Sequence, residues 1–334
     1  MPGLEPLANA AQPAHAPLCG AQYVIPVTLS PSDPTLYHIV GWLYSRGPLE
    51  GKTVQIVLHG GTYDHNYFNL PYQPSNYSYV DYMLNAGYAI LDIDRIGSGL
   101  SDHPAPDQVT MVSGAYTIHQ IVQGLRSGTL TGTKFNKVML VGHSLGSGIS
   151  LVEAATFNDV DAVILSGFAS AVNPAGYNEA EAGLEAANSD PRFTNLPNGY
   201  EIIQPADRAA LFYNAQDADP NVIALDQLLQ QTVTDGELGQ ITSVFTANTY
   251  SSQVRVPVLI ANGSDDGLFA GAGMPFNGDD PNSIKSFEAP FFPLVPSLTV
   301  FVLKNSGHDI NLHLNAPDWF AAARAWSDQN VGSH

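Results

Sequence analysis

The sequence predicts an α/β fold with one large insertion. A chain of 334 residues suits an α/β domain of about 250 residues with additional material. Hydrophobic residues make up 44% of it, which is enough for a sizeable core. Short apolar runs alternate with helical segments on both sides of this insertion. Between about Phe168 and Val254 no buried core strand is evident, so we interpret this range as inserted.

The expected core elements follow from hydrophobic periodicity. Residues 23–29 and 36–44 alternate or run apolar around a proline-rich turn, which predicts two antiparallel strands. Residues 111–126 place their apolar side chains on one helix face. Further strands are expected at 53–58, 88–93, 137–141, 162–165, 256–261 and 297–303. Further helices are expected at 79–86, 146–157 and 318–328.

These elements divide the chain into three parts. Residues 1–20 are rich in Ala and Pro, and we expect them to be poorly ordered. Residues 21–167 and 255–334 form the expected core, and residues 168–254 form an expected helical cap over the site. A solvated decoration remote from the chemistry is the alternative. Helices are expected in the cap at 178–187, 206–213, 221–231 and 238–247. The expected apolar roof of a pocket consists of Phe193, Leu196, Tyr200, Leu211, Phe212, Leu228 and Leu229.

A candidate nucleophile lies in the stretch Gly142-His143-Ser144-Leu145-Gly146, which follows an apolar strand and precedes a helix. This stretch matches the Gly-x-Ser-x-Gly pattern of a nucleophile elbow, which holds a serine clear of its own strand. Glycine at both flanking positions avoids collisions in such a strained turn. The N–H of Leu145 would begin the helix without an intrahelical partner, so it can bind a developing oxyanion.

A second signal is His59-Gly60-Gly61, at the end of an expected strand. The N–H of Gly61 is the expected second oxyanion donor, and that of Thr62 is the alternative. Thr62, Tyr63 and His143 are further candidates for substrate contacts.

The acid and base candidates follow the last two expected strands. Asp266, three residues after Gly263, is the favoured acid, and Asp265 is the alternative. Gly307 allows the last loop to turn, so that His308 can reach back to the serine.

Cofactor and metal sites are not expected. The Gly97-Ser98-Gly99 piece lacks the third glycine and the following helix of a dinucleotide loop. Asp64 and His65 lack a third ligand at a suitable spacing. His308 and His313 are five residues apart, which does not place them on one helix face.

Charge and composition restrict the partners. With 12 Lys and Arg against 31 Asp and Glu, the net charge of −19 repels nucleic acid and anionic membranes. No run of eighteen apolar residues is present, so no transmembrane segment is expected. Only 13% of residues are charged, which favours a secreted protein, although residues 1–20 do not form a signal peptide. The lone Cys19 allows no internal disulfide. The sequence indicates no oligomeric state.

With Ser144, Asp266 and His308 in this order, the chain resembles the α/β-hydrolase superfamily from about Tyr23 to Ser327. The matching pieces are His59-Gly60-Gly61, Asp94-Arg95-x-Gly97-x-Gly99-x-Ser101, Gly142-His143-Ser144-Leu145-Gly146, Gly263-x-x-Asp266 and Gly307-His308. The resemblance implies an eight-stranded, mostly parallel sheet flanked by helices, a cap after the sixth strand, and no cofactor.

The expected activity is hydrolysis of a small carboxylic ester that is partly apolar or aromatic. Ser144 would attack the carbonyl carbon, His308 would take its proton, and Asp266 would orient the imidazole, giving an acyl-enzyme. An acyltransferase, a perhydrolase or a lactonase would use the same residues. A binding protein without catalysis on the hydrolase fold is the more distant alternative.

Overall fold

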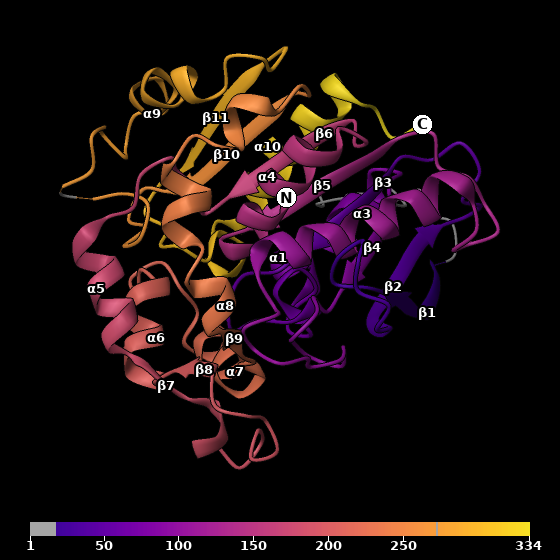
Figure 1. Cartoon of the computed structure of the whole chain (residues 1–334). Coiled ribbons are helices and arrows are strands. Elements are labelled where there is room, and N and C mark those ends of the chain that lie inside the picture. The colour runs from indigo at the N-terminus through magenta and orange to yellow at the C-terminus, as the bar shows by residue number, and fades with distance from the viewer. Residues whose placement is uncertain (1–17, 272) are drawn as a thin grey trace, which may run out of the picture.

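Eight strands form one mixed sheet in the computed structural model, which describes residues 18–271 and 273–334 (Figure 1). The strand order is β1-β2-β4-β3-β5-β6-β10-β11. β2 is antiparallel to both β1 and β4, and the other neighbours are parallel. This confirms the expected mostly parallel sheet of eight strands. The strands are β1 (Leu18–Val27), β2 (Tyr37–Arg46), β3 (Val54–Leu58), β4 (Ala89–Ile93), β5 (Val138–His143), β6 (Ala162–Ser166), β10 (Val258–Gly263) and β11 (Leu298–Leu303). Most of the expected N-terminal segment, residues 1–17, lies outside the described residues.

Helices cover both faces of the sheet, as parallel strands require. In β5, Val138 and Leu140 pack into the hydrophobic cluster that includes α3 and α4. The intervening Met139 and Val141 pack into a second cluster, which includes α2 and α10. Every residue of β5 is buried, which explains its continuous apolar run. The helices outside the insertion are α1 (Pro74–Tyr77), α2 (Tyr79–Asn85), α3 (Met111–Ser127), α4 (Leu145–Phe157), α9 (Pro281–Glu288) and α10 (Ala316–Asn330).

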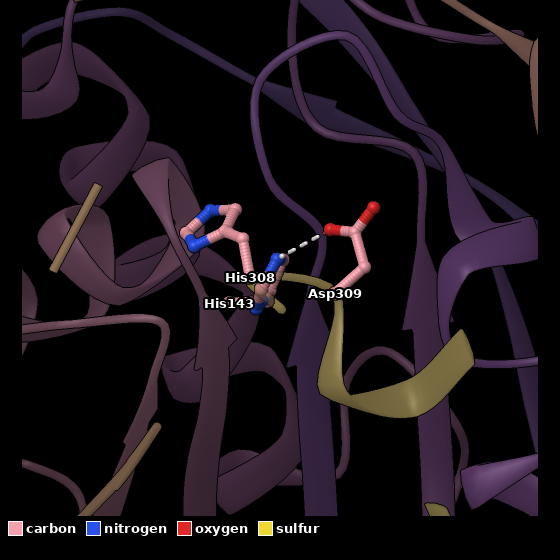
Figure 2. Close-up of side chains that lie close together, drawn as sticks. All are labelled: His143, His308 and Asp309. Carbon is pink, nitrogen blue, oxygen red and sulfur yellow. Dashed lines mark hydrogen bonds and ion pairs between the residues drawn. The ribbon is translucent and has the colours of Figure 1, made fainter. Parts of the chain in front are cut away.

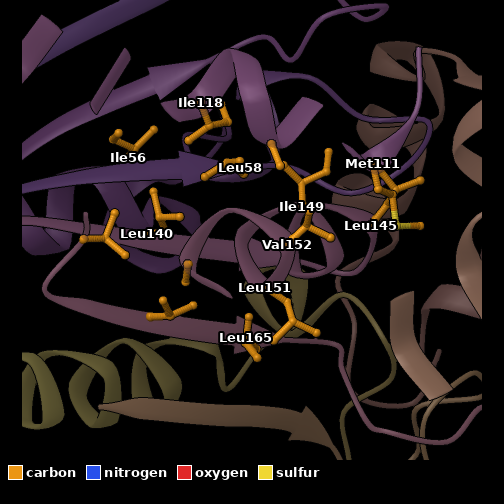
Figure 3. Packing of buried hydrophobic residues seen from close by; sticks show 14 of the residues in the cluster. Ile56, Leu58, Met111, Ile118, Leu140, Leu145, Ile149, Leu151, Val152 and Leu165 are labelled. Atoms are coloured by element: carbon orange, nitrogen blue, oxygen red, sulfur yellow. The ribbon is translucent and has the colours of Figure 1, made fainter. Parts of the chain in front are cut away.

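The first cluster joins α3 and α4 to the strands around the site. Figure 3 shows Ile118 of α3 and Ile149 of α4 close to Leu58 and Leu140 of the sheet. α3 begins at a capping box, in which Thr110 and Ser113 each bind the other's backbone N–H. The helix that follows the serine is therefore packed on the sheet along most of its length.

The insertion between β6 and β10 is not purely helical, in contrast to the expectation. It includes a three-stranded antiparallel sheet of order β7-β8-β9, and β8 is largely buried. Strands of two to four residues are too short to show a period of two in the sequence. The elements of the insertion are α5 (Pro174–Ala182), β7 (Leu184–Ala186), β8 (Tyr200–Ile203), α6 (Pro205–Phe212), α7 (Pro220–Leu229), β9 (Val233–Thr234), α8 (Asp235–Leu238) and a π-helix (Thr242–Thr246).

The carboxyl ends of the parallel strands bring the candidate residues to one edge of the sheet. β3 ends before His59, β5 leads into Ser144, and β10 and β11 precede the loops of Asp266 and His308. This edge is where open α/β sheets bind ligands. In Figure 1 the insertion, with α5 to α8, lies to one side of the sheet. No helix among the described residues is long and apolar enough to cross a membrane.

Candidate active site

Ser144 occupies a strained turn between β5 and α4. Its backbone angles are φ 52° and ψ −119°, a conformation that residues other than glycine rarely adopt. A Cβ atom at Gly142 would lie 2.5 Å from the Gly146 carbonyl oxygen, and one at Gly146 would lie 2.1 Å from that of Leu58. Both glycines are thus required for the close approach of strand and helix, as the pattern predicts.

Asp266 and His308 form a buried pair. The Nδ1 atom of His308 lies 2.9 Å from a carboxylate oxygen of Asp266. Burial raises the pKa of Asp266, but the charge of His308 and its hydrogen bond outweigh burial and lower it below its usual value. Burial lowers the pKa of His308, but the adjacent Asp266 outweighs the effect of burial and raises this pKa above its usual value. Asp265 is exposed and instead binds the side-chain amide of Asn214.

The other ring nitrogen of His308 is left without a hydrogen-bond partner among the described residues. Nε2 of His308 is buried and has no hydrogen-bond partner among the described residues, so Ser144 is not bonded to it. The His308 ring packs between Phe212 and Phe269, with centroids 5.4 and 5.7 Å away. These phenylalanines and Ser144 line the same cavity. His308 therefore contacts two side chains that line the same cavity as Ser144. Catalytic hydrogen bonds are often long or absent in ligand-free enzymes.

Two backbone N–H groups near Ser144 are available to an oxyanion. Leu145 is the first residue of α4, so its N–H lacks an intrahelical acceptor. The Gly61 N–H has no acceptor among the described residues, whereas the Thr62 N–H donates to the Thr232 carbonyl. Gly61 and Leu145 both line the cavity. The geometry therefore favours Gly61 over Thr62 as the second donor.

The candidate substrate contacts His143 and Tyr63 lie in a buried polar network instead. Neither residue lines the cavity. Figure 2 shows His143 beside His308, with Nε2 of His143 3.2 Å from Asp309. Tyr63 donates a short hydrogen bond to Asp309. Burial lowers the pKa of His143 well below its usual value, and His308 lowers it further. His143 is therefore a neutral member of this buried network.

Arg208 of the insertion completes this network and was missed by the sequence analysis. Its guanidinium binds both carboxylate oxygens of Asp226, at 2.8 and 3.1 Å, and donates to the Thr62 hydroxyl. It also stacks 4.1 Å from the ring centroid of Tyr63. Arg208 is only 1% exposed. A buried cation thus links the insertion to the loop that carries Gly61 and Thr62 and, through Tyr63, to Asp309.

His313, considered above only as a metal ligand, fixes the loop of His308. Its Nε2 accepts hydrogen bonds from the backbone N–H groups of Gly307 and Asn214, at 2.9 and 3.0 Å. Its Nδ1 therefore carries the proton and donates to the Asp309 carbonyl oxygen. Both nitrogens are occupied, so His313 acts as a structural residue.

A cavity of about 140 Å³ opens beside Ser144. Most of its lining residues come from the insertion and are apolar, and Glu181 is the one lining carboxylate among the described residues. Of the seven expected roof residues only Phe212 lines it, and Leu228 is 73% exposed. Phe193, Leu196 and Tyr200 form a separate small cluster. Apolar composition alone could not distinguish the cavity wall from this packing.

Comparisons with known proteins agree with this architecture. A sequence profile of the Alpha/beta hydrolase family matches residues 55–323. No curated protein sequence gives a match. A thermophilic esterase from Thermogutta terrifontis has a similar structure, with a TM-score of 0.63, 14% identity, and coverage of 92% of this chain and 98% of that chain.

Two further solved structures show the same similarity. A carboxylesterase from Bacillus subtilis has a TM-score of 0.56 and 18% identity, over 92% of this chain and 91% of that one. A monoacylglycerol lipase from Paleococcus ferrophilus has a TM-score of 0.55 and 17% identity, over 94% and 100%. Identities this low show a shared fold alone. Because the family profile itself spans most of the sequence, the chain belongs to the α/β hydrolase family.

Proposed function

We propose that the protein is a serine hydrolase that cleaves a carboxylic ester. The observation that carries the proposal is the buried Asp266–His308 pair next to a serine held in a strained turn at an apolar cavity. Esterase and lipase structures with the same fold are consistent with it. The ionised carboxylate of Asp266 keeps the proton on Nδ1 of His308, which leaves Nε2 free to act as a base.

In this mechanism Ser144 attacks the ester carbonyl and His308 accepts the hydroxyl proton. The N–H groups of Gly61 and Leu145 bind the oxyanion, each contributing about 3 kcal/mol to transition-state stabilisation. His308 then returns the proton to the leaving alcohol, which produces an acyl-enzyme. A water molecule, deprotonated by His308, releases the acid and regenerates Ser144.

The substrate class follows from the lining of the cavity. An apolar wall stabilises an aliphatic or aromatic group by removing it from water. The single carboxylate of Glu181 and the net charge of −19 disfavour anionic substrates. We therefore propose an uncharged small ester with an apolar acyl or alcohol part.

The experiment is hydrolysis of p-nitrophenyl esters of graded chain length by the wild type and by Ser144→Ala. We expect turnover by the wild type and a loss of kcat on the order of 10⁴ to 10⁶ in the variant. Equal activity of the two folded proteins would reject Ser144 as the nucleophile. If both are inert, labelling of Ser144 by a fluorophosphonate distinguishes a selective enzyme from a binding protein.

Product analysis separates hydrolysis from acyl transfer. With an added alcohol as competing acceptor, a hydrolase yields mainly the free acid, whereas an acyltransferase yields mainly the new ester. A dominant ester product would overturn the hydrolase assignment while leaving the catalytic residues in place.

A further inference from the structure

A second cluster of ionisable side chains lies where α3 and α4 pack together, at residues that do not line the cavity. It consists of His119 on α3, Glu153 on α4, and Asp159 in the segment between α4 and β6. One ligand atom from each residue lies within 4.8 Å of the other two. Nothing in the proposed mechanism uses these residues.

No contact among the described residues explains why the carboxylate of Glu153 is buried. Glu153 is completely buried, and neither of its oxygens has a hydrogen-bond partner among the described residues. One carboxylate oxygen of Asp159 is also buried without a hydrogen-bond partner among the described residues. Burial, and then the adjacent Asp159, raise the pKa of Glu153 well above its usual value. Unpartnered buried oxygens on two adjacent carboxylates are costly, so a proton or a cation must lie between them.

The neighbouring side-chain donors bind oxygen atoms other than those of Glu153. Arg126 donates to the main-chain oxygen of Asp159 and pairs with the side chain of Asp161, at 2.7 Å each. Gln123 and His119 approach only the second oxygen of Asp159, at 2.6 and 2.8 Å. The imidazole of His119 therefore lies at the cluster with Nδ1 directed inward. Within the described part of the chain, no side-chain or backbone donor reaches the oxygens of Glu153.

We propose that His119, Glu153 and Asp159 bind one divalent transition-metal ion of the zinc class. One imidazole nitrogen and two carboxylates are a donor set that Zn²⁺ accepts, with water completing a tetrahedron. The side chains of His119 and Asp159 are 25% and 14% exposed, so an ion can enter from the surface. The ion would neutralise the buried carboxylates and connect α3 to α4, the helix that follows Ser144.

The first test is calorimetric titration of Zn²⁺ into the full chain after treatment with a chelator. We expect one site in the wild type and a dissociation constant at least ~100-fold weaker in Glu153→Gln. Asp102→Asn is the matched control, because Asp102 forms an exposed pair with His38 at 3.0 Å and no third ligand joins them among the residues that the structure describes. Binding in this control should equal that of the wild type. Co²⁺ in place of Zn²⁺ should give a visible absorption band that Glu153→Gln lacks.

Thermal unfolding distinguishes a bound metal ion from a proton shared by the two carboxylates. Without metal, Glu153→Gln should be at least as stable as the wild type, because the glutamine amide can donate to Asp159. With Zn²⁺ at 100 times its dissociation constant, Tm should rise by roughly 5 °C in the wild type and not in the variant. Equal Zn²⁺ binding by both proteins, or none by either, would overturn the proposal in favour of a shared proton.

A third variant tests whether Zn²⁺ binds at a different cluster of the chain. Asp64, His65 and Asp94 also bring ligand atoms within 4.8 Å of one another. Loss of Zn²⁺ binding in His65→Gln but not in Glu153→Gln would assign the ion to that cluster and overturn the proposal.

Discussion

Asp266 accepts a hydrogen bond from Nδ1 of His308 at 2.9 Å, and its second oxygen accepts two more, from the N–H groups of Leu268 and Phe269. These bonds keep the carboxylate ionised in a fully buried position. An ionised acceptor fixes His308 as the Nδ1–H tautomer, so Nε2 carries the lone pair that a base requires. The neighbouring Asp265 has none of these contacts.

The first prediction concerns this choice of acid. Asp266→Asn should reduce kcat for a p-nitrophenyl ester by about 10⁴, because an asparagine amide favours the wrong imidazole tautomer. Asp265→Asn, the matched control, should retain nearly full activity because Asp265 is exposed and binds Asn214. A large loss in the Asp265 variant with little loss in the Asp266 variant would contradict the assignment.

The second prediction concerns the size of the acyl pocket. Gly148 lies one turn after Ser144, and a Cβ there would approach the Phe245 ring to 2.8 Å and Met111 Sδ to 2.9 Å. Both neighbours line the cavity. Gly148→Ala should therefore narrow it and lower kcat/KM for the longer esters by about tenfold or more, with little effect on acetate esters.

A matched helix glycine provides the control for this effect. Gly114 on α3 contacts Ile149, which does not line the cavity. Gly114→Ala should leave the chain-length profile unchanged, whereas Phe245→Leu should extend it to longer esters. An unchanged profile in Gly148→Ala would show that the acyl group binds elsewhere.

The third prediction concerns the buried cation. Arg208→Met leaves Asp226 without its partner in a buried site, which should lower the free energy of unfolding by about 3–5 kcal/mol. The double variant Arg208→Met/Asp226→Asn should recover much of this loss, because it removes the isolated charge. Urea unfolding measures both. Arg324→Met, which breaks an exposed pair with Asp328, should change stability by less than about 0.5 kcal/mol. An additive double variant would contradict the coupling.

The elements that sequence could predict are those whose signals are local. The turn at Ser144 is encoded by two glycines within five residues, and the spacing after Gly263 favours Asp266 as the candidate acid. Arg208 carried no such signal, because its partners Thr62 and Asp226 are brought to it only by folding.

The insertion also contains elements that have no clear local signal in the sequence. The strands β7 to β9 are too short for periodicity, so an apolar pattern suggested helices where a small sheet is also present. The roof residues were misassigned because an apolar side chain can line a cavity or fill a core equally well. Only Phe212 does the former.

The fourth prediction concerns pH and the start of the insertion. Glu288 is completely buried, and its two oxygens accept hydrogen bonds from the N–H and the hydroxyl of Ser170, at 2.7 and 2.6 Å. Burial raises the pKa of Glu288 to about 7, and the bonds from Ser170 offset only part of this. Since the pKa in the folded state exceeds the ordinary value of 4.5, the folded protein retains a proton that the unfolded chain releases.

The contribution of Glu288 to stability is therefore fully present below pH 4.5 and is lost as the pH rises through 7. The wild type should lose about 3 kcal/mol relative to Glu288→Gln across this interval. Urea unfolding of both proteins at several pH values from 4.5 to above 7 measures the difference. Glu50→Gln, at an exposed position, should follow the wild type. A difference between wild type and Glu288→Gln that does not change with pH would mean that Glu288 is ionised throughout, with the two bonds from Ser170 outweighing the cost of its burial.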